Sequence, residues 1–163
     1  MDRLDRKILA LLQEDATLPV SDVARKVGLS TTPCWRRIQK MEENGVIKER
    51  VAILDPDKVN AGVTIFVSIN TGTHSAEWLA DFARHVASLS EVVEVYRMSG
   101  EVDYLLRVLV PNMSAVDAFH RRLVSKVNIR KVSLSFAIEK IKYGTQLPLN
   151  YMQLSDGRYA GVA

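Results

Sequence analysis

The sequence of 163 residues contains a single cysteine, Cys34, so it cannot form an internal disulfide. Its histidines, His74, His85 and His120, are far apart and form no zinc-binding spacing, so we expect neither a metal site nor a cofactor. No apolar run approaches the ~20 residues that a membrane span needs. The first residues also lack the basic and apolar regions of a secretory signal. These absences predict a cytoplasmic protein without membrane contact.

The chain also carries little net charge. It has 22 basic and 19 acidic residues, a net charge of +3, although its isoelectric point is about 9.1. Residues 23–41 nevertheless hold five basic residues and no acidic one. Such a cluster is commonly a solvated face, but the helices predicted around it favour a nucleic-acid partner.

Three short helices are predicted at the start of the chain. Apolar residues recur at helical spacing over residues 2–14. A second helix is expected from an N-cap at Ser21 to Gly28, a residue that suits a left-handed C-terminal turn. A third helix follows the N-cap Ser30 and ends near Gly45. Two helices joined by a short turn with glycine form a helix-turn-helix motif, whose second helix enters the major groove of DNA.

The third helix presents a polar face opposite its apolar stripe. Cys34 belongs to the stripe, and we expect a buried apolar residue rather than a reactive thiol. Trp35, at the border, either packs or touches DNA. Arginine can pair with guanine or bind a phosphate, and Lys40 is expected to contact phosphate. The predicted DNA-binding residues are Ser30, Thr31, Thr32, Trp35, Arg36, Arg37 and Lys40.

Residues 46–54 have an extended pattern that ends at Asp-Pro-Asp, residues 55–57. This segment is either a wing against the DNA backbone or a connector to a second domain. We favour a connector in which Lys48 or Arg50 contacts phosphate.

The second domain has the element order βαββαβ. This is the order of the ferredoxin-like fold, in which both helices cover one face of an antiparallel sheet. The predicted fold class is therefore α+β. The expected elements are strands over 64–71, 92–98, 104–110 and 130–142, and helices over 75–88 and 111–127.

The open face of this sheet carries apolar side chains, among them Phe66 and Tyr96. An exposed apolar face typically has a partner, so we expect dimers. The tail from Gly144 has no clear period and is expected either to pack loosely on a neighbour or to be mobile. The predicted domains are a DNA-binding domain with a linker strand over 1–60, a sensing and oligomerisation domain over 61–143, and a tail over 144–163.

Several segments of the chain resemble the Lrp/AsnC feast/famine regulators. Residues 4–9, 27–38 and 43–47 resemble their DNA-binding domain, and residues 99–106 resemble the Gly-x-x-Asp-Tyr segment of their ligand-sensing domain. The resemblance covers about residues 2–143. It implies a winged helix-turn-helix domain and a dimerising ferredoxin-like domain of RAM type. It further implies that the dimers assemble into octamers or similar, and that a free amino acid bound between dimers alters DNA binding or assembly.

Finer features resemble the cysteine-responsive subgroup of this family, which implies L-cysteine as the effector. These features are Thr-Thr-Pro-Cys-Trp at 31–35, His-Ser-Ala-Glu-Trp at 74–78, Arg-Met-Ser-Gly-Glu at 97–101, Ser-Phe-Ala at 135–137 and the segment 142–148. Val102 stands where the family usually has an aromatic residue, and the residues after about 150 extend past its common end.

An amino-acid ligand needs donors for its carboxylate and acceptors for its ammonium group. Gly100 permits close approach of backbone groups, and Asp103 or Glu101 offers an acceptor. Alternatively, Gly100 only forms a hairpin turn and Asp103 only caps it. The resemblance adds Ser135 and Phe136 from a neighbouring copy. The predicted effector-binding residues are Met98, Ser99, Gly100, Glu101, Asp103, Tyr104, Ser135 and Phe136.

Three functions remain open from the sequence. The first is a sequence-specific transcriptional regulator that binds double-stranded DNA and responds to a small amino acid. The second is an architectural DNA-compacting protein with little sequence preference. The third is a small enzyme or metabolite-binding protein that uses the second domain alone. We expect no catalytic residues, because the chain shows neither a phosphate-binding glycine-rich loop nor a nucleophile–base pair.

Overall fold

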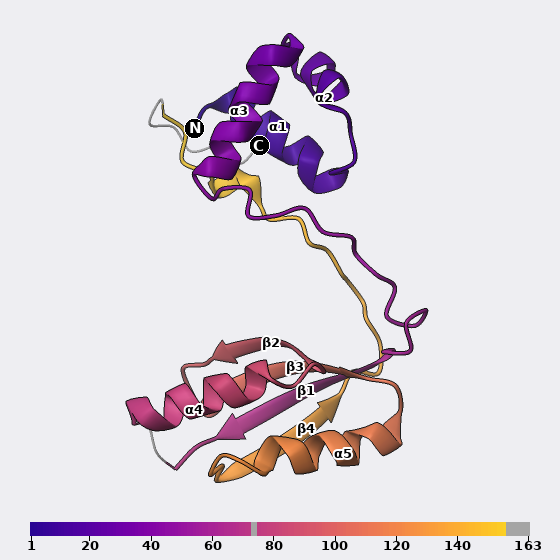
Figure 1. Cartoon of the computed structure of the whole chain (residues 1–163), viewed down its shortest axis with the longest axis vertical. Helices are drawn as coiled ribbons and strands as arrows, with labels where there is room; N and C mark the ends of the chain where they lie inside the picture. Colours follow the sequence, from indigo (N-terminus) through magenta and orange to yellow (C-terminus); the bar gives the residue numbers. More distant parts are fainter. Residues whose placement is uncertain (73–74, 156–163) are drawn as a thin grey trace. The chain divides into compact units, whose positions relative to one another are not determined.

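The computed structural model describes residues 1–72 and 75–155, which form two compact units (Figure 1). One unit contains residues 1–52 together with the tail from residue 142, and the other contains residues 53–141. His74, which belongs to the subgroup resemblance, and the tail residues 156–163 lie outside the described residues. No described helix is long and apolar enough to cross a membrane.

The first unit has the predicted helix-turn-helix. Its helices are α1 (Arg3–Glu14), α2 (Val20–Val27) and α3 (Thr31–Glu43). Gly28 ends α2 with a φ of 75°, the left-handed conformation expected of it. The three helices share one apolar core, made of Ile8, Leu9, Val23, Ala24, Val27, Cys34, Ile38 and Met41.

One of the two predicted N-caps, Ser21, is wrong, whereas Ser30 is confirmed as the N-cap of α3. Helix α2 begins before Ser21, because Pro19 is its N-cap and accepts hydrogen bonds from the Asp22 and Val23 amides at 2.9 and 3.1 Å. Proline suits this position because its backbone is already fixed near the required φ. Ser30 does precede α3, but its side chain makes no capping hydrogen bond.

The segment between α3 and β1 carries no strand in the structure, and all of it is described. It is therefore a connector, and the wing that the resemblance implied is not formed there. Arg50, considered for a phosphate contact, forms an ion pair with Glu42 of α3 at 2.9 Å.

The second unit has the predicted βαββαβ order. Its elements are β1 (Val63–Asn70), α4 (Ala76–Ala87), β2 (Val92–Arg97), β3 (Tyr104–Val110), α5 (Met113–Val124) and β4 (Lys131–Phe136). The strands form one antiparallel sheet in the order β2-β3-β1-β4, as the ferredoxin-like fold requires. Helices α4 and α5 cover the same face, where their apolar side chains meet alternate residues of β1 and β3 (Figure 1).

The last strand ends earlier than predicted. Strand β4 stops at Phe136, whereas the alternation of the sequence predicted a strand to residue 142. The Ala137 amide still donates to the Thr64 carbonyl, one residue from the start of β1 at Val63, so the pairing ends close to the end of its neighbour. Ile138, the next residue, is fully exposed.

The tail packs against the helical unit, so the expectation of a loose or mobile tail is wrong for its described residues. Gln13 of α1 exchanges two hydrogen bonds with the backbone of Leu147, at 2.7 and 3.3 Å. A short 3₁₀ helix, η1 (Leu149–Tyr151), follows. Leu149 and Met152 pack against the helical core, and Leu154 is only 6% exposed. The tail therefore extends the small core of the helical unit.

Candidate nucleic-acid interface and effector site

The start of α3 is an exposed polar surface. Every predicted DNA-binding residue except Arg37 is exposed, whereas Cys34, Ile38 and Met41 of the same helix are buried. Trp35 is 50% exposed, so it does not occupy a core position. Cys34 is fully buried, and burial raises the pKa of its thiol, as expected of an apolar residue rather than a nucleophile.

The cations of this surface are available to a ligand. Among the residues that the structure describes, neither Arg36 nor Lys40 takes part in an ion pair. A cavity of about 610 Å³ lies beside them, between α3 and the N-terminal residues. An exposed helix start with threonines, a tryptophan and uncommitted cations can contact both base edges and phosphates.

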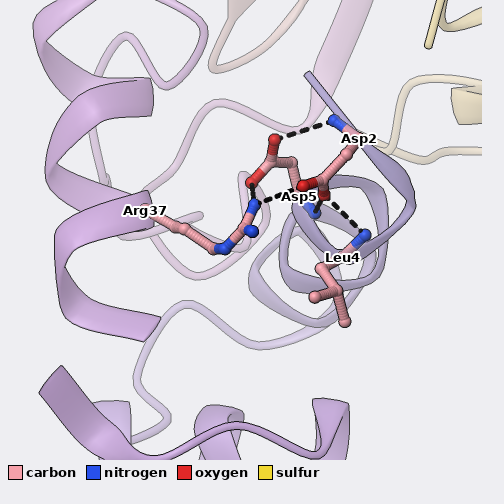
Figure 2. Close-up of polar contacts among 4 residues, drawn as sticks. All are labelled: Asp2, Leu4, Asp5 and Arg37. Atoms are coloured by element: carbon pink, nitrogen blue, oxygen red, sulfur yellow. Dashed lines mark hydrogen bonds and ion pairs between the residues drawn. The ribbon is translucent and has the colours of Figure 1, made fainter. Parts of the chain in front are cut away.

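Arg37 is differently placed, although it adjoins Arg36. Its Nη1 atom donates to Asp2 Oδ2 and to Asp5 Oδ1, each at 2.7 Å (Figure 2). Asp2 and Asp5 form the capping box of α1, in which each side chain accepts a hydrogen bond from the other residue's amide. Sequence reasoning missed this triad, although acids three residues apart before an apolar run are a capping signal.

The hydrogen bonds of the triad shift the pKa values of Asp2 and Arg37. Burial raises the pKa of Asp2, but hydrogen bonds from the Asp5 and Leu4 amides and from Arg37 outweigh it and hold the pKa below its ordinary value. Hydrogen bonds to Asp5 and Asp2 raise the pKa of Arg37. Both shifts favour the charged forms of Asp2 and Arg37.

The predicted effector segment is the turn between β2 and β3. The Met98 amide donates to the Asp103 carbonyl at 2.8 Å, which closes the hairpin. Gly100 has a φ of 126°, so this position favours glycine. The Asn70 side-chain amide donates to the Glu101 carbonyl, which ties the turn to the end of β1. Met98, Ser99, Gly100 and Glu101 are all exposed.

Asp103 anchors the same turn. Its amide donates to the Ile69 carbonyl at 3.0 Å, and its Oδ2 atom accepts a hydrogen bond from the Thr71 amide at 2.8 Å. The turn-capping role considered for Asp103 is therefore present in the structure. Asp103 is half-buried beside this turn.

The other predicted effector residues lie elsewhere in the unit. Tyr104 is 4% exposed and packs in the core, 4.8 Å from Phe82 between ring centroids. Ser135 and Phe136 pair with Phe66 and Ile65, whereas Tyr104 pairs with Ile69. Four residues of a strand span ~13 Å, so these two groups lie toward opposite ends of the sheet. One chain does not bring them together around a single ligand.

One feature of this unit was not predicted. A cavity of about 380 Å³ lies between α4 and the edge strand β2. Its walls are mainly apolar, with the charged residues Glu94 and Arg97 among the lining residues. No sequence pattern reveals it, because it arises from the packing of a helix on a strand. No group of three or more potential metal ligands occurs in the part of the chain that the structure describes.

Two protein-family models match the chain. The AsnC-type helix-turn-helix domain matches residues 1–42, and the Lrp/AsnC ligand binding domain matches residues 64–147. The DNA-binding transcriptional activator DecR of Escherichia coli K12 is 47% identical over 150 residues, which cover 91% of this chain and 99% of the relative. The glutamate uptake regulatory protein of Zymomonas mobilis is 46% identical over 149 residues, with 91% of each chain covered.

Solved structures agree with these matches. The crystal structure of an AsnC family transcriptional regulator from Agrobacterium tumefaciens has a TM-score of 0.91 and 67% identity, and the match covers 93% of this chain and 99% of that one. A transcriptional regulator of Neisseria meningitidis, solved in complex with L-Met, has a TM-score of 0.89 and 33% identity at the same coverage.

Proposed function

Because the chain belongs to the Lrp/AsnC family of transcriptional regulators, we propose that it binds specific sequences of double-stranded DNA and that a small amino acid controls this binding. The observation that carries the proposal is the exposed polar face of α3, where Arg36 and, in the last turn, Lys40 have no ion pair among the described residues. Such a helix enters the major groove, where each good bidentate arginine–guanine pair contributes ~1–3 kcal/mol of discrimination.

A homodimer is the proposed functional unit, and dimers are proposed to assemble further, as octamers. The open face of the sheet supports dimerisation, since Phe66 is 39% and Tyr96 is 51% exposed there. Two copies also supply two recognition helices, which suits a DNA site with two half-sites.

The proposed effector is a small amino acid, with L-cysteine as the first candidate from the resemblance. It would bind at the turn of residues 98–103, with Ser135 and Phe136 supplied by another copy. The distance between these groups within one chain supports a site shared between copies. The Neisseria relative was solved with an amino acid, L-Met, which favours the same class of ligand here.

A salt titration tests the DNA-binding proposal. A duplex would be selected from a random library, and its affinity compared with that of a scrambled duplex between 50 and 200 mM salt. We expect the selected duplex to bind ~10³-fold more tightly or better, since base contacts add to the phosphate term. Equal affinity with a steep salt dependence would instead support an architectural protein. Absence of DNA binding, with an amino-acid response retained, would support a metabolite-binding protein.

Thermal unfolding tests the effector site. We expect one or a few of the twenty common amino acids to raise the melting temperature, because a ligand that binds only the native state stabilises it. Asp103→Asn keeps an acceptor for the Thr71 amide but removes the charge, and should weaken the response at least ~10-fold. Glu101→Gln makes the same charge change at Glu101, the other possible acceptor for the ammonium group of the ligand. If the amino acid raised the melting temperature of Asp103→Asn as it does that of the unmodified protein, Asp103 would not be part of the effector site.

A further inference from the structure

In the ion-pair triad of Arg37, Asp2 and Asp5, both carboxylates are fully hydrogen-bonded. Asp2 Oδ1 accepts from the Leu4 and Asp5 amides at 2.8 and 3.0 Å, and Asp5 Oδ2 accepts from the Asp2 amide at 2.8 Å. Arg37 occupies the remaining oxygen of each carboxylate (Figure 2). Every carboxylate oxygen therefore has a donor, and removal of Arg37 would leave the 12% exposed Asp5 side chain without its counter-charge.

The charge of the triad argues against a phosphate contact by Arg37. One guanidinium and two carboxylates carry a net charge of −1, and the N-terminus of α1 further stabilises these acids. Both Nη1 protons of Arg37 are donated to carboxylates, so a DNA phosphate could bind only at Nη2 or Nε, where it would meet the negative charge of Asp2 and Asp5. Arg36 offers its cation without that cost.

The triad also links two helices that otherwise touch little. Helix α1 meets α3 over a smaller contact than α2 does, whereas Arg37 lies near the middle of α3 and its two partners lie at the first turn of α1. Arg37 therefore adds two ion pairs between α3 and the first turn of α1 to the apolar core that these helices share.

We infer that Arg37 is a positioning residue: it fixes the recognition helix against the capping box of α1, and the arginine contact with DNA is made by Arg36. This inference rests on the proposed DNA-binding function. Arg36 and Arg37 therefore have different roles, although they are adjacent and carry the same charge.

Binding of the selected and scrambled duplexes by four variants of the full chain tests it. Arg37→Gln should lower affinity for the selected duplex ~10-fold and leave the scrambled duplex and the salt slope unchanged, because no phosphate contact is lost. Arg36→Gln, the matched control with the same charge change, should lower affinity for the selected duplex. If Arg36 contacts a phosphate, Arg36→Gln also reduces the salt slope, the dependence of log K on log salt concentration, by ~0.9.

The Asp5→Asn variant is expected to change DNA affinity in opposite directions, depending on whether Arg37 positions α3 or binds a phosphate. A positioning role predicts weaker binding of the selected duplex, and the Asp5→Asn/Arg37→Gln double variant should lose no more than either single variant. A phosphate-binding Arg37 would be released by Asp5→Asn, so that both duplexes would bind more tightly. That result, or a fall of ~0.9 in the salt slope of Arg37→Gln, would overturn the inference.

Hydrogen exchange supplies a readout that needs no DNA. Arg37→Gln should speed amide exchange at Leu4 and Asp5, the amides held by Asp2, while Arg36→Gln should not. Unchanged exchange in Arg37→Gln would also overturn the inference. Equal binding of both duplexes by the unmodified protein would contradict the proposed function instead, so the two failures are distinguishable.

Discussion

The Phe82→Ala variant is expected to lose about 3–5 kcal/mol in the free energy of unfolding of the second unit. Phe82 is 1% exposed and stacks on Trp78 with ring centroids 5.0 Å apart. Tyr104 lies 4.8 Å away on the same cluster. Truncation removes an aromatic ring from the contact between α4 and the sheet, beside a cavity that already exists there. Relaxation of the surrounding side chains can therefore fill only part of the space left by the Phe82 ring.

Urea denaturation followed by tryptophan fluorescence measures this loss. The chain has two tryptophans, so a Trp35→Phe background leaves Trp78 as the reporter for the second unit. Met113→Ala is the control, because Met113 is 61% exposed at the start of α5 and should change stability by no more than about 0.5 kcal/mol. A loss below about 1.5 kcal/mol for Phe82→Ala would contradict the tight packing of this cluster.

Local periodicity was sufficient to predict the fold. The helical spacing before Gly28 and after Ser30, and the alternation over 64–71 and 104–110, are properties of short segments. The order of these segments then restricts the second unit to few topologies. The structure has the predicted helices and strands, with shifts at their ends that depend on a neighbour, as at the end of β4.

The sites were less predictable because they depend on contacts between distant residues. Arg36 and Arg37 are equivalent in the sequence, and only the position of Asp2 and Asp5, more than thirty residues away, separates them. Tyr104 is a different case, because a usable signal was present. It begins the alternation that continues through Leu106 and Val108, all of them buried, so its position in the strand already indicated the core.

The tail shows a further limit of periodicity. Residues 145–155 contain apolar side chains without a regular spacing, which favoured a loose or mobile segment. A segment without regular secondary structure can still bury individual side chains wherever its backbone directs them toward another element. Here Leu149, Met152 and Leu154 are covered, while Leu147 and Tyr151 are 72% and 71% exposed.

We expect the covered side chains of the tail to stabilise the helical unit. Replacing Leu149, Met152 and Leu154 together by alanine should lower the free energy of unfolding of the helical unit by about 4 kcal/mol, since each buried leucine or methionine truncation costs ~2–5 kcal/mol when complete and less when partial. The helical core contains only eight buried residues, so the unit has little stability to lose. We expect its melting temperature to fall by ~15 °C or more.

The exposed apolar residues of the tail supply the control within the same segment. The double variant Leu147→Ala/Tyr151→Ala removes a comparable apolar mass from exposed positions and should melt within a few degrees of the unmodified protein. Circular dichroism at the helical band follows both variants, and binding of the selected duplex reports whether α3 is still presented. If the triple variant melted as the double variant does, the tail would be a passive extension. If only the triple variant loses stability and DNA binding together, the DNA-binding unit requires both ends of the chain.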